Sequence, residues 1–193
     1  ITASGVAKES KVTFEKQNGT GGDDSATATY DNAMPKISVP TRKGYTFQGY
    51  YTQADGKGTQ YYKADGTSAK ICDFYVPTTL YAYFKANTYK IIYKASQPED
   101  AKTNGNYVQG DVYSDTFTYD QSGKIAENTF TLKGWHFDGW HFKEKRYDAG
   151  QSVVNLTDVD GATIEFYAHW EPNYYKVIYE KNQPQTAGTV EGE

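Results

Sequence analysis

The chain has little cysteine, methionine and proline, and it lacks a long apolar run. Of its 193 residues, one is cysteine (Cys72), one is methionine and six are proline. A single cysteine excludes an intrachain disulfide and any metal site built from paired cysteines. No apolar run approaches the ~20 residues of a membrane-spanning helix, and Ile1 opens no signal peptide. We therefore expect no membrane insertion, and we expect the sequence to be a fragment of a longer protein.

The chain also lacks an excess of positive charge. Twenty Lys and Arg side chains stand against 24 Asp and Glu, which gives a formal net charge of -4. Both signs are interspersed, so no basic patch is present that could follow a phosphate backbone. Nucleic acid is excluded as a partner.

Aromatic residues are abundant. Nineteen Tyr, nine Phe and three Trp carry most of the apolar area, while the hydrophobic fraction as a whole is only 37%. Because each ring buries a large area, small cores built from rings are expected.

Three segments occur twice along the chain. Residues 44–50 (GYTFQGY) return at 134–140 (GWHFDGW), residues 81–84 return at 167–170, and residues 89–98 return at 175–184. The glycines and aromatics are kept while the polar residues differ, which indicates selection for packing rather than for chemistry. The repeats predict a leading segment at 1–10, one module at 11–86, a second at 87–172, and the opening strand of a truncated third repeat at 173–193.

The alternation within each repeat predicts strands. We expect Tyr45 and Phe47, and their counterparts Trp135 and Phe137, to be buried anchors on the inward face. Gly49 is expected to continue that inward row at a place narrowed by another backbone. In the last strand of each repeat, the inward rows are expected to be Leu80, Ala82 and Phe84, and Phe166, Ala168 and Trp170.

The order of these motifs resembles a known family. A short Val-Thr-Phe strand precedes Pro40-x-x-x-Gly-Tyr-x-Phe-x-Gly-Tyr, a turn-rich stretch and Leu80-Tyr-Ala-x-Phe, and the same order returns in the second copy. This pattern is similar to the Listeria-Bacteroides repeat, or internalin B-repeat. Tyr50 and Phe84 stand where the family often has Trp, and the second copy has a longer early loop. The resemblance implies a β-rich α+β fold: two tandem small β-grasp (ubiquitin-like) modules with little helix.

The resemblance also implies a function. Members of the family form tandem modules of secreted or wall-anchored bacterial surface proteins, so we expect an extracellular, non-catalytic stalk or spacer that displays a functional domain. The short links at 85–88 and 171–173 are not rich in Gly or Ser, which predicts a semi-extended array of neighbouring repeats. The alternative is an adhesive module that binds a host protein or glycan through exposed aromatic residues: Tyr50, Tyr81, Tyr83, Trp140 and Tyr167.

The sequence offers no catalytic constellation. His136, His141 and His169 all lie in the second copy, without the spacing of a metal site, and the five-residue separation of the first two predicts opposite faces of a strand. Cys72 has no histidine motif beside it and is expected to be a packed thiol. We predict no catalytic, cofactor-binding or metal-binding residues, no cofactor and no enzymatic activity.

Two smaller alternatives remain open. Asp158-Val-Asp160-Gly161 has the oxygens and turn of a calcium loop but lacks the downstream bidentate Glu, so a plain turn is favoured. A Lys-to-Asn or Lys-to-Asp isopeptide bond would require a buried lysine inside an aromatic core, which is costly unless the lysine is paired.

Overall fold

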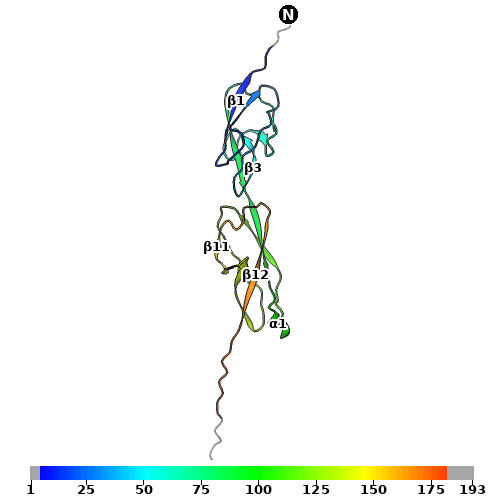
Figure 1. Ribbon diagram of the computed structural model, residues 1–193, viewed down its shortest axis with the longest axis vertical. Coiled ribbons are helices and arrows are strands. Elements are labelled where there is room, and N and C mark those ends of the chain that lie inside the picture. Colours follow the sequence, from blue (N-terminus) through cyan, green and yellow to red (C-terminus); the bar gives the residue numbers. More distant parts are fainter. Residues whose placement is uncertain (1–4, 182–193) are drawn as a thin grey trace, which may run out of the picture.

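The computed structural model describes residues 5–181 and shows two β-sheet units that follow one another along a long axis (Figure 1). The first four residues of the leading segment, and residues 182–193 of the predicted third repeat, lie outside the described part. The described chain is β-rich, and its helix is a single five-residue turn, as the sequence predicts.

The first unit is a five-stranded sheet. Its strands are β1 (Glu9–Glu15), β2 (Ser25–Thr29), β3 (Tyr45–Tyr51), β4 (Gln60–Lys63) and β5 (Thr78–Ala86). Their order in the sheet is β2-β1-β5-β3-β4, and β1 pairs with β5 in parallel, whereas the other neighbours are antiparallel. The first and last strands of the unit therefore lie side by side at its centre.

The second unit repeats this arrangement. Its main sheet contains β6 (Thr88–Lys94), β7 (Tyr113–Thr118), β9 (Trp135–Phe142), β10 (Lys145–Tyr147) and β12 (Thr163–Pro172), and β8 (Gly123–Lys124) and β11 (Ser152–Val153) form a small separate ribbon. The order β10-β9-β12-β6-β7 is that of the first unit read from the other edge, with β6 and β12 again parallel. The long early loop expected in the second copy carries the helix α1 (Glu99–Thr103).

Each unit has its own aromatic core. The fully buried large side chains include Tyr50, Tyr62 and Leu80 in the first unit and Tyr93, Trp140 and Phe166 in the second. The two cores share no residue. Because burial of ring area is the main stabilising contribution in such small units, each sheet has its own source of stability.

A glycine bulge interrupts the signature strand in both units. Along β3 the register with β5 shifts between Phe47 and Gly49, and along β9 the register with β12 shifts at the matching place. Gly49 and Gly139 have φ of +133° and +125°, which L side chains rarely adopt. The extra residue of a bulge reverses the alternation beyond it, so Tyr50 rather than Gly49 continues the inward row. The expectation for Gly49 is wrong in this respect, although the Tyr62 backbone does lie close over it.

The inward rows of the last strands are confirmed, whereas only one of the four predicted anchors is buried. Leu80, Ala82 and Phe84 are buried, and so are Phe166, Ala168 and Trp170. Of the four predicted anchors, Phe47 is buried, whereas Tyr45, Trp135 and Phe137 are partly exposed. Tyr45 and Trp135 begin their strands, so they lie at the end of each core rather than in its middle.

The link between the units is shorter than expected. The predicted opening strand of a third repeat is not formed within residues 173–181. β5 ends at Ala86 and β6 begins at Thr88, so Asn87 alone separates them. Residues 173–181 contain no strand, and Tyr175 and Tyr179 are 80% and 89% exposed. A strand requires a hydrogen-bonded neighbouring strand, and within residues 5–181 no strand pairs with residues 174–181.

Candidate functional site

The two sheets meet at Asn87, which is only 8% exposed. Its backbone N–H donates to the carbonyl of Gly44 at 2.9 Å, and its side-chain Oδ1 accepts a hydrogen bond from Thr46 Oγ1 at 2.6 Å. Both contacts attach this single linking residue to the first unit.

The same residue also binds the second unit. The Asn87 carbonyl accepts from the Tyr119 N–H at 2.8 Å, and its side-chain Nδ2 donates to the Asp158 carbonyl at 2.7 Å. The backbone and the side-chain amide therefore each contact both units. Since a buried amide that loses its partners costs about 1–3 kcal/mol, these contacts restrict the angle between the sheets.

Aromatic packing extends the junction beyond Asn87. The Tyr119 ring lies across Gly44, where an added Cβ would come within 2.2 Å of the ring. Tyr119 also meets the Tyr45 ring edge to face, with centroids 5.9 Å apart, and the Arg42 guanidinium lies 3.7 Å from the Tyr45 centroid. Only glycine at position 44 leaves room for this ring and also adopts its φ of +74°.

An ionised carboxylate is hydrogen-bonded at the edge of the junction. Tyr45 donates from Oη to Asp120 Oδ2 at 2.8 Å, and Asn155 Nδ2 donates to Asp120 Oδ1 at 2.7 Å. The hydrogen bonds from Asn155 and then from Tyr45 lower the pKa of Asp120, and the same contact to Asp120 raises the pKa of Tyr45. The pair therefore favours a charged Asp120 facing a neutral Tyr45.

The acidic turn is part of this junction. Asp160 Oδ1 accepts the Thr88 N–H at 2.9 Å, while the Asp158 carbonyl accepts from Asn87. Oxygen atoms that the calcium alternative would need are thus hydrogen-bonded to the first residues of the second unit. The turn at 158–161 therefore contacts Asn87 and Thr88, which its own sequence does not indicate.

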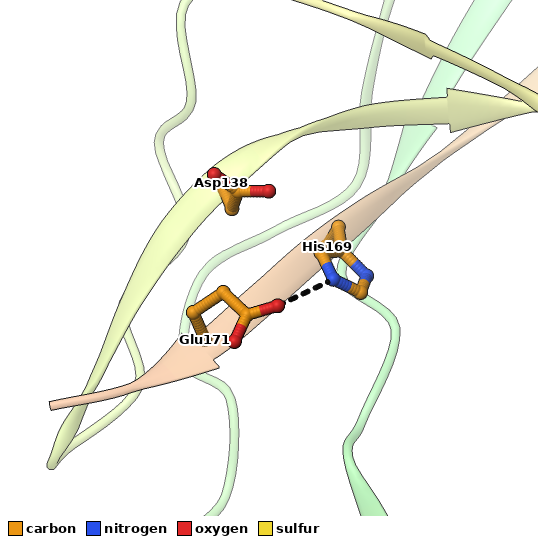
Figure 2. Close-up of side chains that lie close together, drawn as sticks. All are labelled: Asp138, His169 and Glu171. Atoms are coloured by element: carbon orange, nitrogen blue, oxygen red, sulfur yellow. Dashed lines mark hydrogen bonds and ion pairs between the residues drawn. The ribbon is translucent and has the colours of Figure 1, made fainter.

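A second cluster lies on the outer face of the second sheet. Figure 2 shows Asp138 on β9 facing His169 and Glu171 on β12, and their ligand-type atoms lie within 4.8 Å of one another. His169 Nε2 and Glu171 Oε1 are 3.1 Å apart. An imidazole with two carboxylates is a donor set that zinc accepts.

An arginine already occupies the anionic side of this cluster. Arg146 Nε lies 3.4 Å from Asp138 Oδ2, and the arginine also pairs with Asp148. A fixed guanidinium beside Asp138 supplies the positive charge that a metal ion would otherwise supply, and it repels an incoming cation. The cluster is accounted for as surface ion pairs.

His141 adjoins the same cluster. Its ring stacks on that of His169 at 4.5 Å with an interplanar angle of 7°, and its Nε2 is buried without a hydrogen-bond partner among the described residues. Burial, followed by the charges of His169 and Arg146, lowers the pKa of His141. His136 and His141 are opposite Glu171 and Tyr167 of β12, on one face, so the expectation of opposite faces is wrong because the bulge between them reverses the alternation.

The aromatic residues expected to bind a host protein or glycan are mostly not fully exposed. Tyr50 and Trp140 are fully buried, so their assignment as exposed binding residues is wrong, and the glycine bulge again explains the error. Tyr81 and Tyr83 are partly buried, and Tyr167 is 41% exposed. Of the five proposed residues, Tyr81, Tyr83 and Tyr167 therefore remain at the surface.

The remaining candidates have structural explanations. Cys72 is fully buried and its Sγ lies 3.3 Å from the Phe74 carbonyl, as expected of a packed thiol. The buried polar residues among those described are Ser10 and Asn87, so no lysine of the described part lies in a core where an isopeptide bond could form.

Two sheets of equal strand order, joined through the single residue Asn87, define a protein built from structural repeats. Residues 11–82 match the Listeria-Bacteroides repeat domain, which confirms the resemblance for this part of the chain. A Gly-rich membrane protein of Evansella cellulosilytica is 26% identical over 161 residues, which cover 79% of this chain and 17% of that relative. The chain thus corresponds to a small part of its relative. No solved structure matches significantly. None of the described helices has the length and apolar character needed to span a membrane.

Proposed function

We propose that the chain is a non-catalytic stalk segment of a bacterial surface protein, in which residues 11–86 and 87–172 are successive β-grasp modules. The strand order with a parallel central pair, found in both units, supports the β-grasp assignment. The junction at Asn87 is the observation that carries the function, because a spacer must resist bending and this link is one buried, fully hydrogen-bonded residue.

The comparisons support a location at the cell surface. The Listeria-Bacteroides repeat and the relative named as a membrane protein both favour a protein of the cell surface. An extracellular stalk held by a wall or membrane anchor elsewhere in the full protein is the arrangement that we propose. Its partners are the neighbouring repeats.

Small-angle X-ray scattering of the purified chain tests the spacer. We expect the pair-distance distribution of a rod of two units in line, as in Figure 1, and unchanged dimensions between low and moderate salt. A distribution typical of one compact globule, or of two units at freely varying angles, would contradict a stalk.

A groove on the second unit supports an adhesive role as the second candidate. It has a volume of 670 Å³ and is lined by Phe142, Ile164 and Tyr167 among others. Partly exposed rings beside a groove suit a sugar or peptide side chain. Binding on a glycan array that is lost in Tyr167→Ala but kept in Tyr107→Ala, an exposed tyrosine outside the groove, would support recognition. Absence of saturable binding would contradict it.

A further inference from the structure

The far end of the second unit carries residues that align with those of the first half of the junction. We define the distal surface as Gly134, Trp135, His136 and Asn173. These align with Gly44, Tyr45, Thr46 and Asn87, respectively. Figure 1 shows the chain leaving this end of the second unit after β12.

The backbone of the distal surface is already set as in the junction. The Asn173 N–H donates to the Gly134 carbonyl at 2.8 Å, as Asn87 donates to Gly44 at 2.9 Å. Gly134 has φ of +81° against +74° for Gly44. The distal surface therefore has the backbone conformation found at the junction, although no further unit contacts it within the described residues.

The side chains of the distal surface are arranged in the same way. Asn173 Oδ1 lies 2.9 Å from His136 Nδ1, as Asn87 Oδ1 lies 2.6 Å from Thr46 Oγ1. In the junction the amide nitrogen of Asn87 is then free to donate to the next unit. The amide nitrogen of Asn173 donates to none of the described residues, so the corresponding donor is available.

The distal surface differs from the junction in what covers it. A Cβ at Gly44 would collide with the Tyr119 ring, whereas a Cβ at Gly134 would meet nothing within 4 Å among the described residues. Trp135, the counterpart of Tyr45, is partly exposed. The uncovered surface of Gly134, beside the partly exposed Trp135 indole, leaves room for one aromatic ring.

Both repeats carry the aromatic-acid pair that would fill this place. Tyr119 and Asp120 cover the first half of the junction, and Tyr30 and Asp31 stand at the same position of the first unit. Asp120 and Asp31 share an unusual φ, of 60° and 66°. The Tyr30 ring meets that of Tyr75 edge to face at 6.1 Å and is still 42% exposed, so the pair is accessible where no neighbouring unit covers it among the described residues.

We infer that the distal surface is the docking site for a further repeat of the same kind that follows Asn173 in the same chain, with a tyrosine equivalent to Tyr119 lying over Gly134 and against Trp135. The inference rests on the proposed stalk function and adds which residues join the next unit. The residues after Asn173 support this occupant, since Tyr175, Val177 and Tyr179 repeat the inward row of β6 and are exposed. The array would then have the same joint at each link.

The test is a chain extended by a second copy of residues 87–172 placed directly after Pro172. Asn87 of the copy then occupies the position of Asn173. Trp135→Phe in the copy leaves the original Trp135 as the partly exposed indole, because Trp140 and Trp170 are buried. We expect the accessibility of Trp135 to acrylamide to fall relative to the unextended chain, and ¹⁵N relaxation to show all units tumbling together.

Matched variants in the copy identify the contact. Tyr119→Ala in the copy should abolish the protection of Trp135, whereas Tyr107→Ala, an exposed tyrosine of the long loop, should leave it intact. An unprotected Trp135 with the third unit tumbling independently would overturn the inference, even if scattering still shows the first two units as a rod. A collapsed shape of the unextended chain would instead contradict the stalk. Protection of Trp135 that appears only with rising concentration of the unextended chain would assign the surface to a separate molecule and overturn the inference as well.

Discussion

Thr46 and Asn87 are joined by a hydrogen bond of 2.6 Å from Oγ1 to Oδ1, at the boundary between the two sheets. The bond leaves the Asn87 amide nitrogen directed to Asp158 of the second unit at 2.7 Å. The Asn87 side chain thus contacts both units, and we expect the stiffness of the link to depend on these contacts.

Removal of this side chain should loosen the link. Asn87→Ala leaves the Thr46 hydroxyl and the Asp158 carbonyl without their partner, and we expect a loss of about 1–3 kcal/mol in the free energy of unfolding. Urea unfolding should give the loss, and ¹⁵N relaxation should show the units tumbling more independently. Asn32→Ala is the control, because Asn32 is exposed and its side chain makes no hydrogen bond to the described residues. Equal behaviour of the two variants would refute the role of Asn87.

The two bulge glycines should differ in their tolerance of a side chain. A Cβ at Gly49 would lie 2.2 Å from the Tyr62 carbonyl oxygen, which is backbone and cannot move aside. A Cβ at Gly139 would lie 2.9 Å from Nε of the flexible Arg146 and 3.1 Å from the Tyr147 carbonyl oxygen. Since both positions have positive φ, alanine is strained at each, but only Gly49 adds a severe collision.

We therefore expect Gly49→Ala to cost about 3 kcal/mol or more and Gly139→Ala about 1–2 kcal/mol. Denaturant unfolding of each variant, followed by NMR signals of each unit, measures the two costs separately. A Gly139→Ala variant as damaging as Gly49→Ala would show that backbone strain alone, and not the carbonyl contact, sets the cost.

The aligned core rings Tyr50 and Trp140 should respond differently to phenylalanine. The Tyr50 hydroxyl is buried without a hydrogen-bond partner among the described residues, whereas Trp140 Nε1 donates to the Ala126 carbonyl at 2.9 Å. Tyr50→Phe removes an unsatisfied polar atom and keeps the ring contact with Phe14, so stability should stay equal or rise by up to about 1 kcal/mol.

Trp140→Phe has the opposite expectation. It removes a satisfied hydrogen bond and leaves a cavity in the second core, which should cost about 2–4 kcal/mol. Thermal unfolding monitored by calorimetry compares the two variants. A clear loss of stability in Tyr50→Phe would indicate that its hydroxyl does have a partner in solution.

Most of the fold can be predicted from the sequence because residues that pack in the cores recur in both copies, whereas the polar residues differ. The inward rows of β5 and β12 could be read from simple alternation, since neither row is broken within those strands. The repeated Gly-aromatic motif could not be read that way. A bulge adds one residue without changing composition, so simple alternation predicts Tyr50 and Trp140 on the outer face although both lie in the cores.

The junction was harder to predict for another physical reason. Asn87 acts through contacts with Thr46 and Asp158, which are 41 and 71 residues away, and such distant pairs leave no local pattern. The available signal is the 86-residue spacing of Asn87 and Asn173, which residues 81–84 and 89–98 share with their second copies. The acidic turn at 158–161 keeps calcium open as an alternative from sequence because its oxygens are evident there, whereas their hydrogen bonds are not.

The stacked pair of His141 and His169 should make the second unit sensitive to acid. Burial and the neighbouring His169 and Arg146 lower the pKa of His141 below its ordinary value near 6.5, while Asp138 acts weakly in the other direction. The unfolded chain therefore takes up the proton at a higher pH than the folded chain does. Stability is complete above about pH 6.5 and falls as the pH decreases through the window below that value.

A double variant isolates this effect. His141→Tyr with His169→Tyr removes both imidazoles and reproduces the Tyr51–Tyr83 pair of the first unit, whose rings meet edge to face at 5.9 Å. Urea unfolding of the second unit between pH 7.5 and pH 5, values chosen to span the ordinary histidine pKa, should show a decline in the parent chain and a flatter profile in the variant. His136→Thr, which restores the first-unit residue at an exposed position, serves as the control and should keep the decline. If the double variant loses stability over this range as steeply as the parent, the carboxylates rather than His141 govern the response, since a histidine effect must disappear with the histidine.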